Sequence, residues 1–246
     1  MIESPLTGWL RRGVQRGVAL GYGLAYDAVV STFPPYQSLL DEVASYAARS
    51  VARRPGPGPA RVLDVAAGIG TLAFKLAKAG YSVVAIDPVP RLIDVAKDKR
   101  RARGVSNVDF GCLDIGRDPI PWPETFDFAV SLHTLYWHPF PERVLEATRR
   151  SLRRGAHALV LNYARPTTVR STFRLVRARE GVGRAIRALR WLVPTAMFEC
   201  LRDYEPHFTG PSELQAMVTR AGFQVLEVRQ SFLADVSVLA WARRDG

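Results

Sequence analysis

Hydrophobic and polar positions alternate between two patterns in the middle of the chain. Short runs rich in Val, Ile, Leu and Phe predict buried strands, whereas segments with apolar residues every three or four positions predict helices. The predicted strands are 61–67, 81–87, 105–114, 126–133 and 157–164, and the predicted helices are 71–80, 90–104 and 142–155. Strands that alternate with helices of this length predict βαβ units, so we expect a mostly parallel sheet covered on both faces.

The C-terminal part of the chain breaks this alternation. Residues 211–222 predict a helix that Ser212 caps and Gly222 closes, and strands are predicted at 223–230 and 237–244. Because no helix separates these two strands, we expect them to pair as an antiparallel hairpin at one side of the sheet. The expected fold class is therefore α/β and doubly wound, with seven strands and a C-terminal antiparallel strand.

Segments outside the alternation indicate how the domain is organised. The run PGPGP at 55–59 predicts a linker, because its prolines fix φ and lack a backbone donor. We expect one domain with four parts, which are an N-terminal helical cap at 1–54, a ligand-binding core at 60–164, a helical lid insertion at 165–205, and a C-terminal helix with strands at 206–246. We expect the cap and the lid to cover the carboxyl edge of the sheet, where such folds bind ligands.

Composition narrows the class of protein. A chain of 246 residues, 48% of them hydrophobic, can bury the core of an ordinary α/β domain, and no apolar run approaches the roughly 20 residues that cross a bilayer. The first residues lack the order of a signal peptide, so we expect a cytoplasmic protein. Cys112 and Cys200 have no neighbours at metal-ligand spacing, so we expect two buried thiols and no metal site.

Positive charge is concentrated in one short stretch. The formal net charge is +11, and residues 165–193 hold eight arginines against one acidic residue, Glu180. This stretch and residues 6–24 predict amphipathic helices that either pack on the sheet as a lid with solvated arginines, or bind an anionic membrane surface. The arginines that distinguish the two are Arg174, Arg177, Arg184 and Arg187. Nucleic acid is the least favoured partner, because aromatic residues do not alternate with the arginines.

Glycines and carboxylates meet at the predicted carboxyl edge of the sheet. The turn DVAAGIGT after the first strand holds Gly68 and Gly70, where the backbone can approach a ligand at a helix N-terminus. Asp64, Asp87 and Asp114 close three successive strands. A dinucleotide site uses the acid of the second strand, but its pyrophosphate would lie where Asp64 is expected. A cationic ligand that carries a nucleoside and no phosphate suits all three carboxylates better.

Several segments, in this order, resemble the class I S-adenosylmethionine (SAM)-dependent methyltransferases, a broad group that includes small-molecule and lipid methyltransferases. The segment RVLDVAAGIGTLAFKLAKAGYSVVAIDP resembles the family's first motif and second-strand acid. LDIGRDPIPWPETFDFAVS resembles its third strand, Pro-rich loop and fourth strand, and LRRGAHALVLN the helix, turn and strand that follow. The resemblance covers about residues 60–162 and, less specifically, the segment PSELQAMVTRAGFQVLEV. It implies a Rossmann-like fold with a helical cap, and SAM as the cofactor.

The resemblance also implies roles for individual residues. Asp64 and the backbone of Ala66, Gly68 and Gly70 would bind the methionine part of the cofactor, and Asp87 would bind the ribose hydroxyls. Asp114 would bind the adenine amino group, with Leu113 and Ile115 as apolar walls. Ser131 would be a further cofactor-binding residue. Ala66 stands where the family usually has glycine, and because alanine avoids a positive φ we expect a slightly different turn. The structural alternative for Asp87 and Asp114 is that each caps a helix.

The residues at the acceptor end are less distinctive. The segment SLHTLYWHP at 131–139 predicts an aromatic pocket, in which His133 and His138 are candidate catalytic bases or orienting groups. By the resemblance, Tyr26 in the N-terminal cap is a further catalytic candidate, with core packing as its alternative. The sulfonium of SAM already makes the methyl group electrophilic, so a base is needed only for an acceptor that must lose a proton.

The expected function is SAM-dependent methyl transfer to an apolar or amphiphilic small molecule or lipid, with a lipid head group at an anionic membrane surface as the acceptor that the basic helices favour. In that case the cytoplasmic protein would also associate with membranes. The alternative is a soluble natural-product O-, N- or C-methyltransferase. A second alternative is a non-catalytic SAM-fold binding protein.

Overall fold

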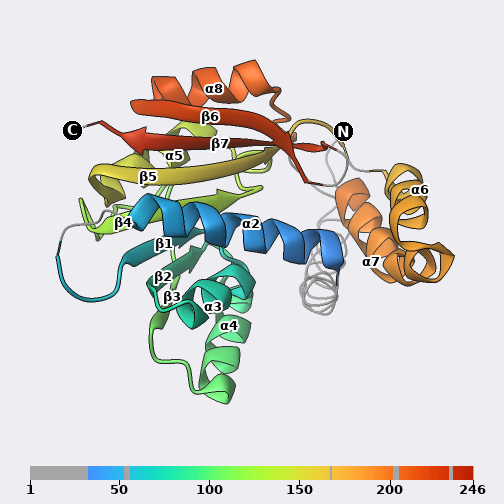
Figure 1. Cartoon of the computed structure of the whole chain (residues 1–246), viewed down its shortest axis with the longest axis horizontal. Helices are drawn as coiled ribbons and strands as arrows, with labels where there is room; N and C mark the ends of the chain where they lie inside the picture. Colours follow the sequence, from blue (N-terminus) through green and yellow to red (C-terminus); the bar gives the residue numbers. More distant parts are fainter. Residues whose placement is uncertain (1–32, 53–55, 167, 202–204, 233–234, 246) are drawn as a thin grey trace, which may run out of the picture. The chain divides into compact units, whose positions relative to one another are not determined.

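The computed structural model describes residues 33–52, 56–166, 168–201, 205–232 and 235–245 (Figure 1). These residues belong to two compact units. The larger, here called the sheet unit, contains Pro34–Pro166 and Glu205–Gly246, and the smaller, here called the hairpin unit, contains the helices within Thr167–Tyr204. All described residues that the sequence assigns to the cofactor or to catalysis lie in the sheet unit.

A seven-stranded sheet forms the centre of the sheet unit. Its strands are β1 (Arg61–Val65), β2 (Ser82–Asp87), β3 (Val108–Cys112), β4 (Phe126–Leu132), β5 (Leu152–Tyr163), β6 (Phe223–Ser231) and β7 (Ser237–Arg244). Their order across the sheet is β3-β2-β1-β4-β5-β7-β6. The neighbours from β3 to β5 are parallel, and β7 is antiparallel to both β5 and β6. The expected doubly wound fold with its C-terminal hairpin is confirmed.

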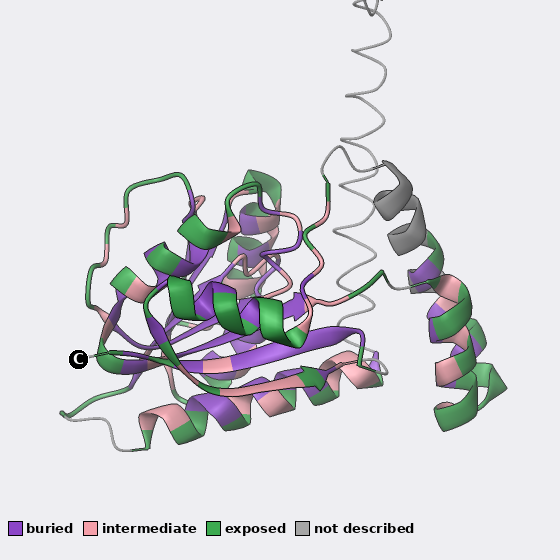
Figure 2. Ribbon diagram, turned by 90° about the horizontal axis from the view of Figure 1, so that it is seen from above, coloured by how far each residue is buried: buried purple, intermediate pink, exposed green. Residues whose placement is uncertain are grey.

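Helices cover both faces of this sheet. They are α2 (Pro34–Val51), α3 (Thr71–Lys78), α4 (Pro90–Arg103), α5 (Pro141–Ser151) and α8 (Pro211–Arg220). Side chains of α2, α3 and α4 share one core cluster with the strands, and those of α5 and α8 share the other. Successive residues of a strand alternate between the clusters, as Val62 and Leu63 of β1 do. The central strands β1, β2 and β4 are therefore buried from both sides, as Figure 2 shows.

Helix α2 packs on a face of the sheet. We expected residues 1–54 to cover the carboxyl edge, but the buried side chains of α2 join the core cluster of α3 and α4. These side chains are Leu39, Leu40, Val43, Tyr46 and Ala47. Their spacing of three and four positions forms one apolar stripe, which a flat sheet face buries well. The remainder of the expected cap, including 6–24 and Tyr26, lies outside the described residues.

Two helix boundaries differ from the prediction. The helix expected to end at Gly155 stops earlier, and β5 begins at Leu152, which is fully buried and pairs with Phe126 of β4. The register shifts just after this pair, and Gly155 lies in the irregular part of β5 with a φ of 74°. At α8 the N-cap is Gly210, and no side chain, Ser212 included, makes a capping hydrogen bond. Long-range strand pairing explains the first difference, because it competes with local helix signals.

Cys112 is exposed, so the expectation that it is a buried thiol is wrong. It is the last residue of β3, which is an edge strand of the sheet. An edge strand lacks a neighbour on one side, so its end is covered less than a central strand. The side chain of Cys200 lies outside the described residues.

Two arginine-rich helices form the hairpin unit. Helices α6 (Val169–Glu180) and α7 (Val182–Leu201) pack against each other, with Val176 and Ala185 buried. Val182, Ile186 and Val193 of α7 are 57%, 56% and 48% exposed, so much of the predicted apolar stripe of this helix faces outward. None of the described helices is both long and apolar enough to span a membrane.

Candidate functional site

The turn after β1 lies at the carboxyl edge of the sheet, and three of its residues have left-handed backbone conformations. Ala66, Gly68 and Gly70 have φ angles of 58°, 57° and 81°. The N–H of Ala67 donates to the carbonyl of Ile86 in β2 at 2.9 Å, and that of Gly70 donates to the carbonyl of Ala67 at 2.9 Å. These bonds hold Ala66 at a positive φ, so the expectation that alanine would avoid this conformation is wrong. The strain costs about 1 to 2 kcal/mol.

The two glycines of this turn serve different purposes. A Cβ at Gly70 would lie 2.5 Å from the ring of Phe110, so glycine is required where α3 begins. A Cβ at Gly68 would meet no atom within 4 Å of it. The backbone of Gly68 therefore borders open space that a ligand can enter.

Asp87 connects the turns that follow β1 and β2. It ends β2 and is buried, with its Oδ2 accepting the N–H of Gly68 and its Oδ1 that of Val89, both at 2.9 Å. Burial raises the pKa of Asp87, and the two backbone donors partly offset this. Asp87 does not cap α4, whose N-cap is Val89. Because a carboxylate oxygen accepts more than one hydrogen bond, Asp87 retains capacity for ribose hydroxyls.

Asp64 is a buried carboxyl group with an unused oxygen. It lies inside β1, one residue before the strand ends, and its Oδ2 has no hydrogen-bond partner among the described residues. Burial, followed by the nearby charge of Asp87, raises the pKa of Asp64 to about 8, although the N–H of Ala73 opposes the shift. A cation bound at this edge would favour the ionised form and supply the missing partner.

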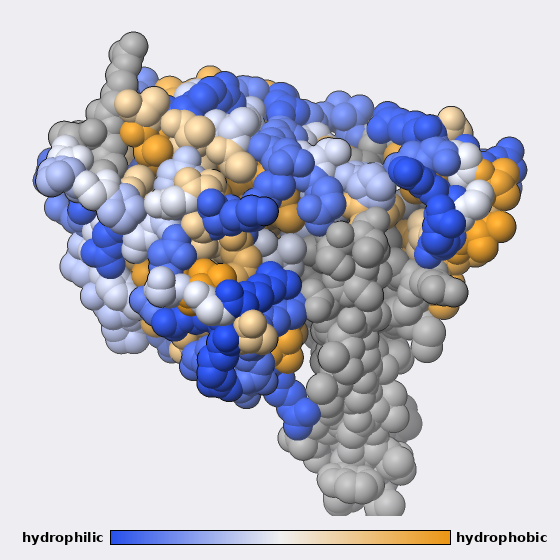
Figure 3. Space-filling model, turned by 60° about the horizontal axis from the view of Figure 1, so that its bottom comes forward, coloured by the Kyte–Doolittle hydropathy of each residue, from blue (hydrophilic) through white to orange (hydrophobic). Residues whose placement is uncertain are grey.

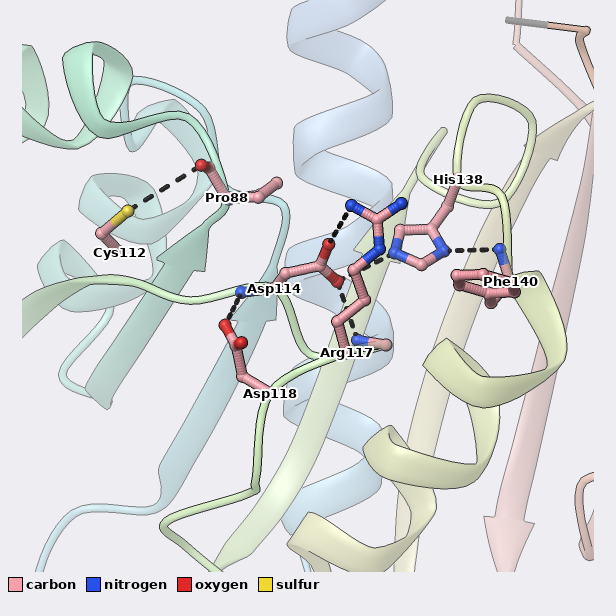
Figure 4. Close-up of polar contacts among 8 residues, drawn as sticks. Pro88, Cys112, Asp114, Arg117, Asp118, His138 and Phe140 are labelled. Carbon is pink, nitrogen blue, oxygen red and sulfur yellow. Dashed lines mark hydrogen bonds and ion pairs between the residues drawn. The ribbon is translucent and has the colours of Figure 1, made fainter.

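Asp114 follows β3 and faces His138 across the edge of the sheet (Figure 4). Its Oδ1 lies 3.0 Å from the backbone nitrogen of Gly116 and 2.9 Å from Nε2 of His138. Its Oδ2 lies 3.7 Å from a guanidinium nitrogen of Arg117. The residues after Asp114 form a turn and no helix, so the helix-cap alternative does not apply to Asp114.

A narrow apolar slot lies beside Asp114. Leu113 and Ile115 line it, as expected for apolar walls, together with Ile86 and the half-exposed Trp137. The hollow is about 10 Å³, which is the room of about one water molecule. A flat purine would therefore enter only as side chains at the mouth of the slot move aside.

The two candidate catalytic histidines are both held by hydrogen bonds. His138 is 2% exposed, and its Nδ1 accepts the N–H of Phe140 at 3.0 Å. The ring of His133 stacks on Tyr163 with centroids 3.8 Å apart, and its Nε2 lies 2.9 Å from Oγ of Ser237. Burial lowers the pKa of His133 to about 3, so it is a weak base near neutral pH. This geometry suits orienting groups better than proton acceptors.

Ser131 lies near the end of β4, beside Val65 of β1 in the parallel register. Its side chain is buried, and its Oγ has no hydrogen-bond partner among the described residues. The structure therefore places Ser131 at the carboxyl edge, as the sequence predicts, with a hydroxyl free to bind a ligand. Tyr26, the remaining catalytic candidate, lies outside the described residues.

An aromatic cluster at the ends of β4 and β5 was missed as a unit by sequence reasoning. Tyr136 contacts Tyr163 edge-to-face at 4.9 Å between centroids and Phe208 at 6.5 Å, and His133 contacts Phe232 at 5.5 Å. These residues, here called the aromatic cluster, come from four separate segments. No spacing along the chain predicts such a group, although SLHTLYWHP signalled part of it.

The chemistry of this edge fits SAM. Asp64 offers an unpaired carboxylate oxygen to a cation, Gly68 leaves room at the backbone, and Leu113 and Ile115 border a slot next to the carboxylate of Asp114. No group of three or more potential metal-binding side chains occurs in the part of the chain that the structure describes.

Comparison with known protein sequences identifies relatives over most of the chain. A family described as "Methyltransferase domain" matches residues 37–228. The ubiquinone biosynthesis O-methyltransferase of Xylella fastidiosa is 30% identical over 178 residues, which are 72% of this chain and 66% of that protein. The magnesium-protoporphyrin O-methyltransferase of Rhodobacter capsulatus is 32% identical over 110 residues, 44% of this chain and 46% of that protein. The matched region thus spans two thirds or less of each of these relatives.

Solved structures share the fold at lower sequence identity. The magnesium protoporphyrin IX methyltransferase of Synechocystis PCC 6803 with bound SAH has a TM-score of 0.57 and 17% identity, and the match covers 86% of this chain and 84% of that one. At this identity the likeness supports the arrangement of strands and helices alone.

Proposed function

The chain belongs to the methyltransferase-domain family, and we propose that it transfers a methyl group from SAM to a small apolar or amphiphilic molecule. The observation that carries this proposal is the meeting of Asp64, Asp87 and Asp114 with the open turn at Gly68 on one edge of the sheet. Carboxylates suit the ammonium group and the ribose hydroxyls of SAM. Unlike a dinucleotide, SAM has no pyrophosphate that would lie against the carboxylate of Asp64.

Different residues at the carboxyl edge would bind different parts of SAM. SAM supplies a methyl group that its sulfonium already makes electrophilic. Asp64 and the backbone at Gly68 would hold the methionine end, Asp87 the ribose hydroxyls, and Oδ2 of Asp114 the adenine amino group. The protein then has to align the acceptor with the methyl group and keep water out.

The aromatic cluster supports an apolar, flat acceptor. Tyr163 is half-buried beside His133, and Phe208 and Phe232 are half-buried around them, so a ring could pack on these side chains. Two relatives, one named for ubiquinone biosynthesis and one for magnesium-protoporphyrin, are O-methyltransferases by name, which agrees with a small-molecule acceptor. In this proposal His133 and His138 orient groups, and neither serves as the base.

A lipid acceptor at a membrane surface is the finer form of the proposal, and the hairpin unit supports it. Val182, Ile186 and Val193 form an exposed apolar stripe on α7, and the exposed arginines Arg184 and Arg187 lie on the same helix. Apolar and strongly hydrophilic side chains also adjoin each other on the surface drawn in Figure 3. Such a helix suits the interface of an anionic membrane.

The test combines binding and turnover. Isothermal titration should show a single site that binds either SAM or its demethylated product. Labelled SAM should transfer its methyl group to apolar phenols, quinols or a lipid extract in preference to polar amines. Binding without transfer to any acceptor would favour the non-catalytic alternative. Transfer only to polar amines would contradict the proposed acceptor class.

A further inference from the structure

We propose that His138 is a positioning residue that fixes the carboxylate of Asp114 and thereby makes the cofactor slot selective for a 6-amino purine. The inference rests on the proposed function, in which Asp114 binds the adenine amino group. Its basis is the chain of contacts Phe140, His138, Asp114 in Figure 4, which joins the start of α5 to the loop after β3.

The contacts of His138 determine which ring nitrogen carries the proton. The backbone N–H of Phe140 can only donate, so Nδ1 of His138, 3.0 Å away, is the acceptor and carries no hydrogen. The hydrogen is then on Nε2, which donates to Oδ1 of Asp114 at 2.9 Å. Phe140 is the N-cap of α5, and its carbonyl accepts the N–H of Val144, so the donor that sets this tautomer is itself fixed by a helix.

Gly116 makes room for this arrangement. A Cβ at Gly116 would lie 2.4 Å from Cε1 of His138 and 2.9 Å from its Nε2. The N–H of Gly116 also donates to Oδ1 of Asp114 at 3.0 Å. Glycine at this position therefore lets the imidazole reach the carboxylate and supplies a second donor to the same oxygen.

The two oxygens of Asp114 consequently have different roles. Oδ1 accepts two hydrogen bonds from buried donors, whereas the guanidinium of the exposed Arg117 is 3.7 Å from Oδ2. Oδ2 is left as the acceptor for an amino group in the slot. Without His138, the carboxylate would be freer to turn toward Arg117, because a single backbone donor would remain on Oδ1.

A fixed carboxylate discriminates between purines by the group on carbon 6. Adenine offers an N–H donor to Oδ2, whereas the 6-oxo purine of an inosine analogue offers a carbonyl oxygen that the carboxylate repels. A mismatch of this kind with a partly buried charged group weakens binding by about ten- to hundredfold. A carboxylate that can rotate away loses part of this selectivity.

The experiment compares affinities for S-adenosylhomocysteine and S-inosylhomocysteine by isothermal titration. The wild type should prefer the adenosine form by about ten- to hundredfold. His138→Phe, which keeps a ring and removes the donor, should reduce this ratio to a few fold, and His138→Gln, whose amide can donate to Asp114, should restore most of it. Gly116→Ala, which displaces the imidazole without deleting it, should reduce the ratio as His138→Phe does.

The ratio separates positioning from a structural role. If His138 had only a structural role, its substitution would weaken the binding of both ligands equally and leave the ratio of the two affinities unchanged. An unchanged ratio in folded His138→Phe and Gly116→Ala would therefore overturn the inference. A wild type that binds both ligands equally would also overturn it, while leaving the methyltransferase assignment in place. A wild type that binds neither ligand would contradict the proposed function itself. Should His138→Phe not fold, Gly116→Ala and His138→Gln still decide the question.

Discussion

Ala66 is the most strained described residue of the turn after β1. Its φ of 58° is unfavourable for a residue with a Cβ, yet the hydrogen bonds of Ala67 to Ile86 and of Gly70 to Ala67 hold the turn on either side. The propensity of alanine predicts the opposite conformation. The intrinsic conformational preference of a residue is therefore a poor guide where hydrogen bonds to a neighbouring strand determine the backbone conformation.

We predict that Ala66→Gly stabilises the protein. Glycine removes the left-handed strain of about 1 to 2 kcal/mol, but it also gives the unfolded chain more freedom, so the free energy of unfolding should rise by about 0.5 to 1 kcal/mol. Ala67→Gly is the matched control, since Ala67 has no positive φ, and it should destabilise. Urea denaturation measures both, and a loss of stability in Ala66→Gly would contradict the strain.

Asp64 should make the stability of the ligand-free protein depend on pH. Its pKa is about 8 in the folded protein and near 4 in an unfolded chain, so between these values the folded state binds more protons. Stability from this group is complete below about pH 4 and falls as the pH rises to about 8. Asp64→Asn should flatten that decline in denaturation measured at pH 5 and pH 9, whereas Asp94→Asn, on the exposed side of α4, should leave it unchanged. Equal slopes in wild type and Asp64→Asn would disprove the burial effect.

At the scale of elements, alternation of strands and helices could be predicted because it depends on local periodicity. The boundary between α5 and β5 could not, because Leu152 is drawn into the sheet by Phe126, a partner distant in sequence. The contact of His138 with Asp114 escaped prediction for the same reason, since 24 positions separate the two residues. Sequence alone identified both residues of that pair but assigned each to the cofactor or to catalysis separately.

We predict that the hairpin unit binds anionic membrane surfaces through its arginines. Wild type should cosediment with anionic vesicles, and replacing four of its exposed arginines by Gln should weaken binding by up to ~4 kcal/mol, at about 1 kcal/mol for each cation. The four positions are Arg174, Arg177, Arg184 and Arg187. Raised salt should reproduce the effect through screening.

A charge-matched variant provides the control for this experiment. It replaces four exposed arginines of the sheet unit by Gln, namely Arg91, Arg101, Arg143 and Arg220. This variant should bind vesicles nearly as the wild type does. No cosedimentation of the wild type at physiological salt, or equal losses in both variants, would refute the lipid-surface form of the proposal.

At the scale of the whole molecule, the strand order explains why the site lies where it does. From β1 the chain continues to β2 and β3 on one side, and β4 lies on the other, so the loops after β1 and β4 diverge at the switch in direction. The sequence predicted that Asp64, Asp87 and Asp114 would share this edge, because parallel strands end together. It could not predict that the aromatic cluster would gather there from four segments.

The most direct test of the central claim is calorimetric titration of SAM into the wild type and into Asp87→Asn. Asp87 joins the glycine turn to the end of β2, and its carboxylate is assigned to both ribose hydroxyls. We predict one SAM site in the wild type and an affinity lower by roughly 1.5 to 3 kcal/mol in the variant, from the loss of charge-assisted hydrogen bonds. An unchanged affinity in a folded Asp87→Asn protein would show that SAM does not bind at this edge of the sheet.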